Sequence, residues 1–348
     1  MRSCIIVLLL LGASVRAAEI PREVVRVEST LATATTQIRQ FAFDKDPATY
    51  YASKSNATKQ DFFTLVFEKP ITIQSIIVLS GTPKGEQQLS AGEIAVSTDG
   101  KKFESIGQFK DGKAEAKGSD ARVLAVRIRP TEDLKHPLVI REITIDSNPR
   151  LQTFRYPVEI ALDVSDAPEM KAWGEKVVQV CEREYPKICD LLASDGFKPL
   201  TQIRMELKSD YKGVAQAAGN RITGSVNYFK DRPADIGAMV HETAHCVQSY
   251  RARNLPGWLV EGVADYVRFW HYEPGKAGRV PLERAKYDGS YRTTATFLAF
   301  ASDKYDAKLV TKLNALLRQG KYDATAWKTI TGKTVEELNQ EWRTSLAK

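Results

Sequence analysis

The 348-residue sequence lacks most features of membrane, fibrous and disulfide-rich proteins. Outside the N-terminus it has no long apolar run, which excludes a polytopic membrane protein. With 43% hydrophobic residues, 27% charged residues and no repeat or low-complexity segment, it is not a collagen, a coiled coil or a disordered chain. A chain of this length is too long for one compact core and fits two domains.

Cysteine is also scarce. Only Cys181, Cys189 and Cys246 follow the N-terminal segment, and an odd number of cysteines does not make a disulfide scaffold. On one continuous helix, Cys181 and Cys189 would lie about 12 Å apart, too far to form a disulfide. A helix break at Pro186 would bring them closer, so the sequence leaves the pairing open.

The N-terminus has the pattern of a secretory signal. A basic start precedes the apolar stretch Cys4–Leu11, and small residues follow it. About 8 to 10 apolar residues are too few to anchor a helix across a bilayer. The best cleavage site is Val15-Arg16-Ala17, with Ala18 as an alternative, so residues 1–17 are expected to be removed. The mature protein is then expected to be secreted or periplasmic, with no integral membrane segment.

The charge balance says little about partners. The formal net charge of +7 becomes +5 (7 − 2) when Arg2 and Arg16 leave with the signal, and the sequence pI is about 9.0. This charge suits a secreted protein that meets anionic polysaccharide or a charged cell surface. Basic residues alternate with acidic ones, and no Lys/Arg block with interleaved aromatic residues indicates nucleic-acid binding.

The first half of the chain is expected to form a β-sandwich domain over residues 24–148. Its short runs rich in β-branched or aromatic residues are 62–67, 71–79, 93–97, 123–129 and 139–145. Asp99-Gly100 is a hairpin-turn signal between two β-type runs. Because no amphipathic helix interrupts this pattern, an antiparallel sandwich is favoured, followed by a linker over residues 149–154.

The second half, residues 155–348, is expected to be an α+β domain. Residues 158–162 and 202–207 have strand character, and residues 223–228 are a third candidate strand. After Asp231 the apolar residues recur at helical spacing almost to the C-terminus.

The main chemical signal is His241-Glu242-Thr243-Ala244-His245. Apolar residues around it recur at helical spacing, so the two histidines, four residues apart, project from one face and can reach the same metal ion. Glu242 is turned aside from that direction, which suits a base acting on metal-activated water. Half of the four histidines in the chain fall in this segment, which argues against a chance match.

Catalytic zinc needs a third protein ligand and one open position. A second helical stretch follows Pro256-Gly257, and on it Glu261 and Asp265 share a face at four-residue spacing. One carboxylate is expected to bind the metal. The other is expected to accept a hydrogen bond from a histidine and so fix its tautomer.

Three segments in this half resemble the basic secretory protein family, a group of metallopeptidases in plants and bacteria. They are the HETAH motif with the following Gln248, PGWLVEGVADYVRFW at 256–270 and YDGSYRTTATFL at 287–298. The resemblance covers roughly residues 155–348. It implies a zincin-like fold of the Glu-ligand (gluzincin) kind, with a small sheet over two active-site helices.

The resemblance also implies roles for five residues. His241, His245 and Glu261 would bind zinc. Glu242 would be the general base, and Asp265 would be the partner of a ligand histidine. No catalytic position of the family pattern is missing from this sequence.

Two further features complete the predicted site. Peptide hydrolysis needs a donor for the developing oxyanion. Among Tyr291, Tyr287 and His271, Tyr291 is favoured because it begins the next helical segment within the family-like run. Residues 219–228, just before the metal helix, are expected to offer an edge strand that pairs with an extended peptide.

The first half resembles discoidin domains, which occur in coagulation factors V and VIII and in many carbohydrate-binding modules. The motifs are AFDKDPATYYAS at 42–53, the strand at 71–79, VSTDGKKF at 96–103 and REITI at 141–145. The resemblance runs from about residue 26 to 147. It implies an eight-stranded, jelly-roll-like sandwich that binds glycans or surfaces through loops at one end.

Some discoidin domains hold a structural calcium ion near the aspartate loop. Asp44, Asp46, Thr49 and Glu142 are oxygen donors suited to such an ion. The alternative is that the loop residues make Asx turns without any ion.

Two hypotheses on function follow. The first is a secreted zinc peptidase that hydrolyses peptide bonds of proteins or glycoproteins, with the sandwich tethering it to a glycan or cell wall. The alternative is a non-catalytic carbohydrate- or surface-binding protein with a structural metal. Structural zinc usually has four protein ligands, whereas HETAH with Glu261 offers three and no obvious fourth, which favours catalysis.

Overall fold

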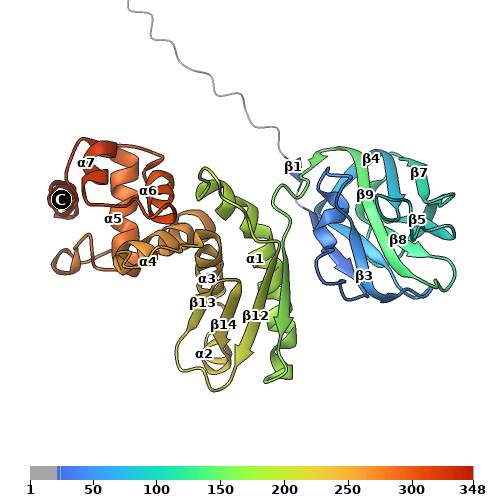
Figure 1. The fold of residues 1–348 in the computed structure, drawn as a ribbon, viewed down its shortest axis with the longest axis horizontal. Helices are drawn as coiled ribbons and strands as arrows, with labels where there is room; N and C mark the ends of the chain where they lie inside the picture. The colour runs from blue at the N-terminus through green and yellow to red at the C-terminus, as the bar shows by residue number, and fades with distance from the viewer. Residues whose placement is uncertain (1–21, 24, 348) are drawn as a thin grey trace, which may run out of the picture.

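The protein, analysed as a computed structural model that describes residues 22–23 and 25–347, contains two domains (Figure 1). An all-β sandwich comes first, and an α+β domain follows it, so the predicted fold class is confirmed. The predicted signal peptide, residues 1–17, lies outside the described residues. Every helix in the described ranges is too short or too polar to span a bilayer.

The sandwich domain consists of eight strands in the order β3-β9-β4-β8-β5-β6, with β2 and β7 both paired to β4. Their bounds are β2 (Val25–Ser29), β3 (Tyr51–Asn56), β4 (Phe63–Ser80), β5 (Gly92–Ser97), β6 (Glu104–Gln108), β7 (Lys113–Lys117), β8 (Arg122–Pro130) and β9 (Pro137–Asn148). All pairings are antiparallel, and alternate side chains fill the core, as in Phe63, Leu65 and Phe67. Asp99-Gly100 lies in the turn between β5 and β6, as predicted.

The two predicted runs at 62–67 and 71–79 form one strand, β4. Its register against β8 shifts between Val66 and Ile71, where Pro70 has no N–H to donate to the ladder. Before the shift β4 pairs with β2 and β8, and after it mainly with β7 and β9. One long strand therefore belongs to both layers of the sandwich.

The second domain has a four-stranded sheet in the order β11-β12-β14-β13. The parallel strands are β11 (Glu159–Asp163), β12 (Gln202–Lys208) and β14 (Arg221–Ser225). Helix α1 (Lys171–Leu191) makes the crossover from β11 to β12, as parallel pairing requires. The short strand β13 (Ala215–Ala218) is antiparallel to β14 and forms the edge of the sheet.

The edge strand predicted within residues 219–228 is wrong in position. Strand β14 lies inside the sheet, between β12 and β13, and it ends at Ser225. The Ser225 hydroxyl accepts the N–H of Tyr228 and so caps a short helix, α2 (Val226–Asp231). The edge is β13, whose Ala-Gln-Ala-Ala sequence carries no β-branched or aromatic side chain to indicate a strand.

Helices follow Asp231 to the end of the described chain, as predicted. They are α3 (Gly237–Gln248), α4 (Gly257–Tyr266), α5 (Tyr291–Lys304), α6 (Leu309–Arg318), α7 (Thr325–Thr331) and α8 (Val335–Leu346). Helix α4 continues into a π-helical segment, η3 (Val267–Tyr272). Figure 1 shows α3 and α4 between the sheet and the group of helices α5 to α7.

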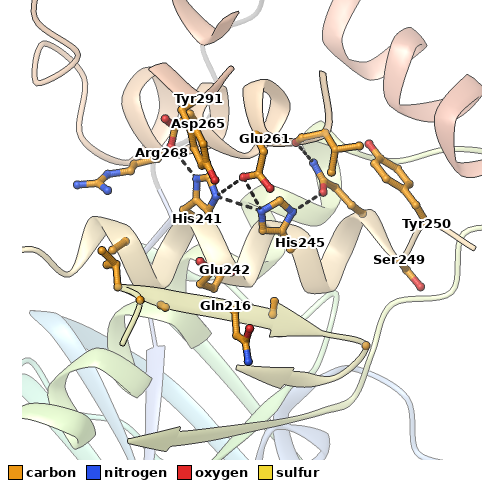
Figure 2. A pocket seen from close by; sticks show the side chains of 18 of the residues that line it. Gln216, His241, Glu242, His245, Ser249, Tyr250, Glu261, Asp265, Arg268 and Tyr291 are labelled. Atoms are coloured by element: carbon orange, nitrogen blue, oxygen red, sulfur yellow. Dashed lines mark hydrogen bonds and ion pairs between the residues drawn. The ribbon is translucent and has the colours of Figure 1, made fainter. Parts of the chain in front are cut away.

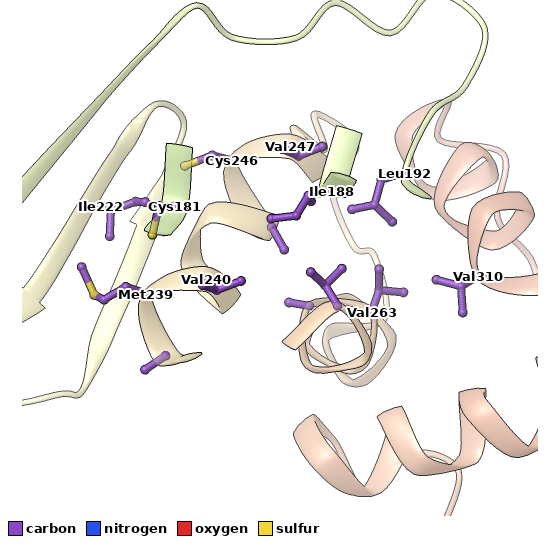
Figure 3. Packing of buried hydrophobic residues seen from close by; sticks show 14 of the residues in the cluster. Cys181, Ile188, Leu192, Ile222, Met239, Val240, Cys246, Val247, Val263 and Val310 are labelled. Carbon is purple, nitrogen blue, oxygen red and sulfur yellow. The ribbon is translucent and has the colours of Figure 1, made fainter. Parts of the chain in front are cut away.

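The apolar faces of α3 pack on its neighbours, which leaves one face for polar chemistry. Figure 3 shows Met239, Val240 and Val247 of α3 among side chains of α1, α4 and β14. Cys181, Cys189 and Cys246 are buried in this core as free thiols. Helix α1 runs through Pro186 without ending, so the helix break that would have brought Cys181 and Cys189 together does not occur.

The sandwich covers the other edge of the sheet, at β11. Glu159 at the start of β11 accepts hydrogen bonds from the hydroxyl of Thr33 (2.7 Å) and the backbone N–H of Arg39 (3.0 Å). The guanidinium of Arg39 also pairs with Glu159 and with Glu182 of α1. Within the connecting segment 149–154, Phe154 is buried and packs edge-on against Phe43 of the sandwich. The sandwich therefore lies across the sheet from the free edge at β13.

Candidate metal centre

Two helices bring the predicted metal ligands together. His241 and His245 lie on α3, and Glu261 lies on α4, with their side chains converging (Figure 2). His241 Nε2 is 3.0 Å from His245 Nε2, and the Glu261 carboxylate is 3.2 Å and 3.3 Å from the two nitrogens. Within the described chain, no other three His, Cys, Asp or Glu side chains have donor atoms within 4.8 Å of one another.

The tautomers of both histidines follow from their second hydrogen bonds. Asp265 Oδ1 is 2.6 Å from His241 Nδ1, and an ionised carboxylate only accepts, so His241 Nδ1 carries the proton. Gln248 Nε2 donates to Val260 O (2.9 Å), which turns its Oε1 toward His245 Nδ1 at 2.7 Å. His245 Nδ1 is therefore also a donor. Each neutral ring then presents a bare Nε2 lone pair at the centre.

This arrangement fits a divalent cation. Three ligand atoms face one another at 3.0–3.3 Å, and when both rings are in their neutral form no hydrogen lies between them. Ligand atoms at zinc distances of about 2.0–2.1 Å in tetrahedral directions lie about 3.3–3.4 Å apart. The two imidazoles and one carboxylate thus have the chemistry and spacing of a three-ligand zinc site.

The charges around the centre reinforce each other. Burial opposes a charge on His241, but the hydrogen bonds that the protonated ring donates to Asp265 and Glu261 outweigh it and raise the pKa of His241 to about 9. Burial acts against ionisation of Glu261 too, yet both histidines together lower the pKa of Glu261 to about 2. The centre therefore strongly favours positive charge, which a metal ion would supply in place of a proton.

Glu242 lies next to the three donors without joining them. Its side chain is buried, and it lines the same cleft as His241 and His245. Burial raises the pKa of Glu242, while the neighbouring histidines act in the opposite direction. A carboxylate with a raised pKa beside a metal site is suited to take up and release a proton.

The cleft has a volume of about 1270 Å³ and lies between β13 and the helices α3 to α5. The edge strand β13 forms one wall. In Figure 2, Arg268 and Tyr291 lie at the His241 end, and Ser249 and Tyr250 lie beyond His245. A long cleft beside an exposed strand edge can hold an extended chain.

Of the three predicted oxyanion donors, only Tyr291 lines the cleft. Its ring stacks beside that of His241, with 6.2 Å between the ring centroids. Tyr287 instead packs against Trp258, and His271 against Tyr266. The negative charge of Glu261, with burial, raises the pKa of Tyr291, which keeps its hydroxyl a donor.

Glycine at position 262 allows this placement of Tyr291. A Cβ on Gly262 of α4 would lie only 2.2 Å from Cγ2 of Thr294, so α5 approaches α4 closely there. Ser290 and Tyr291, where α5 begins, both have a positive φ (61° and 47°). Such backbone costs free energy in residues other than glycine and is concentrated at functional sites.

Three residues of the site were not assigned a role from the sequence. Gln248, one turn after His245 on α3, orients that ring, and its i+3 spacing was the available signal. Arg268, seven residues after Glu261, lines the cleft, as does Tyr211 on the loop before β13. No local pattern in the sequence indicates Tyr211.

The candidate calcium residues lie near one another but do not converge. Asp44 accepts hydrogen bonds from the N–H of Asp46 and the hydroxyl of Thr49, both at 2.9 Å, which are the contacts of an Asx turn. Glu142 is buried, and its Oε2 has no hydrogen-bond partner. Burial and then the charge of Asp44 raise the pKa of Glu142 to about 7. This orphaned oxygen fits either a proton or a cation.

Comparisons with known proteins agree with both halves of the chain. The F5/8 type C domain family matches residues 26–145. One similar solved structure is CBM32-1, a family 32 carbohydrate-binding module from a Clostridium perfringens family 31 glycoside hydrolase. The two sequences are 20% identical, the match covers 35% of this chain and 92% of that chain, and the TM-score is 0.30. Another is chitosan-binding module 1 from a Paenibacillus sp. IK-5 chitosanase/glucanase, with 14% identity, 35% and 93% coverage, and a TM-score of 0.31.

A search of curated proteins finds no match. The family described as "Peptidase of plants and bacteria" (BSP) matches residues 162–342, more than half of the chain, and this range contains both metal-site helices. By this match, the chain belongs to the BSP family of plant and bacterial peptidases.

Proposed function

We propose that the protein is a secreted or periplasmic zinc peptidase that cleaves peptide bonds of proteins or glycoproteins. The observation that carries the proposal is the convergence of His241, His245 and Glu261 beside the buried carboxyl of Glu242 in one cleft. Three protein ligands leave one position for solvent, as in catalytic rather than structural zinc sites.

Each residue of the site has a distinct role in the proposed hydrolysis. Zinc bound there would supply a Lewis acid that acidifies water and polarises the scissile carbonyl. Glu242 takes the proton of the attacking water and passes it to the leaving amine. Tyr291 donates its hydroxyl hydrogen to the carbonyl oxygen as negative charge develops there. Asp265 and Gln248 hold the two histidine rings in position.

The sandwich domain is proposed to bind a glycan or another surface and so to bring the peptidase to its substrate. It packs against β11, across the sheet from the free edge at β13, so its role is tethering and not chemistry. Calcium between the Asp44 loop and Glu142 belongs to the same proposal, supported by the unpartnered Oε2 of Glu142.

The test compares wild-type protein with the Glu242→Gln variant on casein and on a glycoprotein. We expect both proteins to bind one zinc ion per chain and only the wild type to cleave. Equal cleavage by the two would refute the assigned mechanism. Absence of cleavage by zinc-loaded wild type would favour the alternative, a non-catalytic surface-binding protein with a structural metal. Cleavage of short peptides should be the same whether or not a glycan is bound to the sandwich domain.

A further inference from the structure

An arginine with no assigned role lies on the helix face that carries the metal site. Glu261, Asp265 and Arg268 are spaced i, i+4 and i+7, which places them on one side of α4 and η3. The helix becomes π-helical at Val267, a change that often accompanies functional sites. The Arg268 side chain is 18% exposed and lines the cleft at its His241 end (Figure 2).

Two carboxylates fix the guanidinium of Arg268. Its Nη2 donates to Asp235 Oδ1 (2.5 Å), and its Nε donates to Glu273 Oε1 (2.7 Å). Asp235 is itself held by the hydroxyl of Tyr228 at 2.7 Å. A Cβ on Gly237 would lie 2.3 Å from Glu273 Oε1 and 2.7 Å from Arg268 Nε, so the group is closely packed. Nη1 has no hydrogen-bond partner among the residues that the structure describes.

We propose that Arg268 is a substrate-binding residue that donates from Nη1 to a main-chain carbonyl oxygen of the peptide. The peptide would lie extended along β13, and this carbonyl would be on the His241 side of the scissile bond. The inference rests on the proposed peptidase function. A guanidinium held at two of its three nitrogens keeps little conformational freedom, so little entropy is lost when the third binds.

The charge balance also predicts what this arginine rejects. Asp235 and Glu273 pair with Arg268, and Lys276 pairs with the other oxygen of Glu273 at 3.1 Å, so the two positive and two negative charges balance and a neutral carbonyl oxygen is a suitable partner. The group therefore offers no excess positive charge to hold a free C-terminal carboxylate. The cleft is therefore expected to accept an internal segment of a polypeptide, which makes the enzyme an endopeptidase.

Steady-state cleavage of a fluorogenic peptide, capped at both ends and with at least three residues on each side of the cleaved bond, tests this role. Arg268→Ala should lower kcat/KM about ten- to hundredfold, mainly through KM, because it removes one hydrogen bond to a charged donor. Gly237→Ala displaces the guanidinium without removing it and should give a smaller loss. Arg253→Ala, at an exposed arginine that does not line the cleft, is the control and should change kcat/KM less than threefold.

Binding supplies a readout that does not depend on catalysis. Fluorescence anisotropy of the same labelled peptide with the Glu242→Gln protein should give a Kd that rises about ten- to hundredfold when Arg268→Ala is added. Zinc content, measured for every variant, should match that of the parent, and the melting temperature shows separately how much stability is lost when Asp235 and Glu273 lose their partner or Gly237 gains a Cβ. If the Arg268→Ala variant does not fold, the same kinetic and binding measurements are made on the Arg268→Lys and Gly237→Ala variants.

The possible outcomes separate this proposal from the proposed function. If wild-type protein cleaves the peptide and the Arg268 variants bind and cleave it within threefold of wild type, the arginine proposal fails alone. A preference for the peptide that ends in a free carboxylate at this position also contradicts it. If the wild type binds the peptide through Arg268 without cleaving it, only the catalytic proposal fails. If it neither binds nor cleaves, both fail.

Discussion

Replacing Gln248 with leucine should weaken zinc binding without touching a metal ligand. The Gln248 side chain is 1% exposed and makes two hydrogen bonds, one from His245 Nδ1 and one to Val260 O. Leucine fills a similar volume but can make neither bond. The His245 ring then loses the acceptor that fixes its tautomer and directs its Nε2 toward the metal.

The expected size of the effect follows from these two contacts. Loss of a partner that orients a metal-bound histidine lowers metal affinity about 10- to 100-fold, or about 1.4 to 2.7 kcal/mol. The Gln248→Leu variant also leaves two buried polar groups unpaired, each costing about 1–3 kcal/mol, so the metal-free protein should be less stable as well. The two losses must therefore be measured separately.

Competition with a chromophoric chelator gives the zinc affinity, and urea unfolding of the metal-free protein gives the stability. The matched control is Thr243→Val on the same helix, which removes a buried hydrogen bond to Met239 O (2.8 Å) but no contact to a ligand. The control should lose about 1 kcal/mol of stability and keep its zinc affinity. An unchanged zinc affinity in Gln248→Leu would refute the assigned role of Gln248.

Two further predictions concern stability. With a chelator present to remove calcium, the sandwich should lose stability as pH rises from 4.5 to about 7, because the pKa of Glu142 is raised from 4.5 to about 7 and the fold therefore prefers the protonated carboxyl. Far-UV circular dichroism of melting should show this, with Glu142→Gln abolishing it and calcium reversing it if the ion binds. Gly262→Ala should destabilise the second domain by about 1–3 kcal/mol through its clash with Thr294. Tryptophan fluorescence reports this domain, since all five tryptophans follow residue 170.

The metal centre could be predicted from the sequence because its residues lie at helical spacing on two segments. His241 and His245 share a face of α3, and Glu261 and Asp265 share a face of α4. The structure adds that these two faces meet, which depends on how α3 and α4 pack. The runs of β-branched and aromatic residues likewise predicted four of the eight sandwich strands, β4, β5, β8 and β9, and Asp99-Gly100 predicted the hairpin turn.

The structural features that the sequence did not predict depend on tertiary contacts. Residues 215–218 form strand β13 because they pair with β14, whereas their own side chains have little β propensity. Gln248 matters because its amide reaches a carbonyl on another helix, and Arg268 because Asp235 and Glu273 come together around it. The contacts of Gln248 with Val260 and of Arg268 with Asp235 join residues that are distant in sequence, so apart from the i+3 spacing of Gln248 no local pattern indicates these roles.

The most direct measurement is a crystal structure of the zinc-loaded protein with anomalous data at the zinc edge. It should locate one zinc ion about 2.0–2.2 Å from His241 Nε2, His245 Nε2 and a carboxylate oxygen of Glu261. Its fourth position should hold no protein atom and should face Glu242 and the cleft. A zinc ion bound elsewhere, or a fourth protein ligand closing the site, would contradict the central claim.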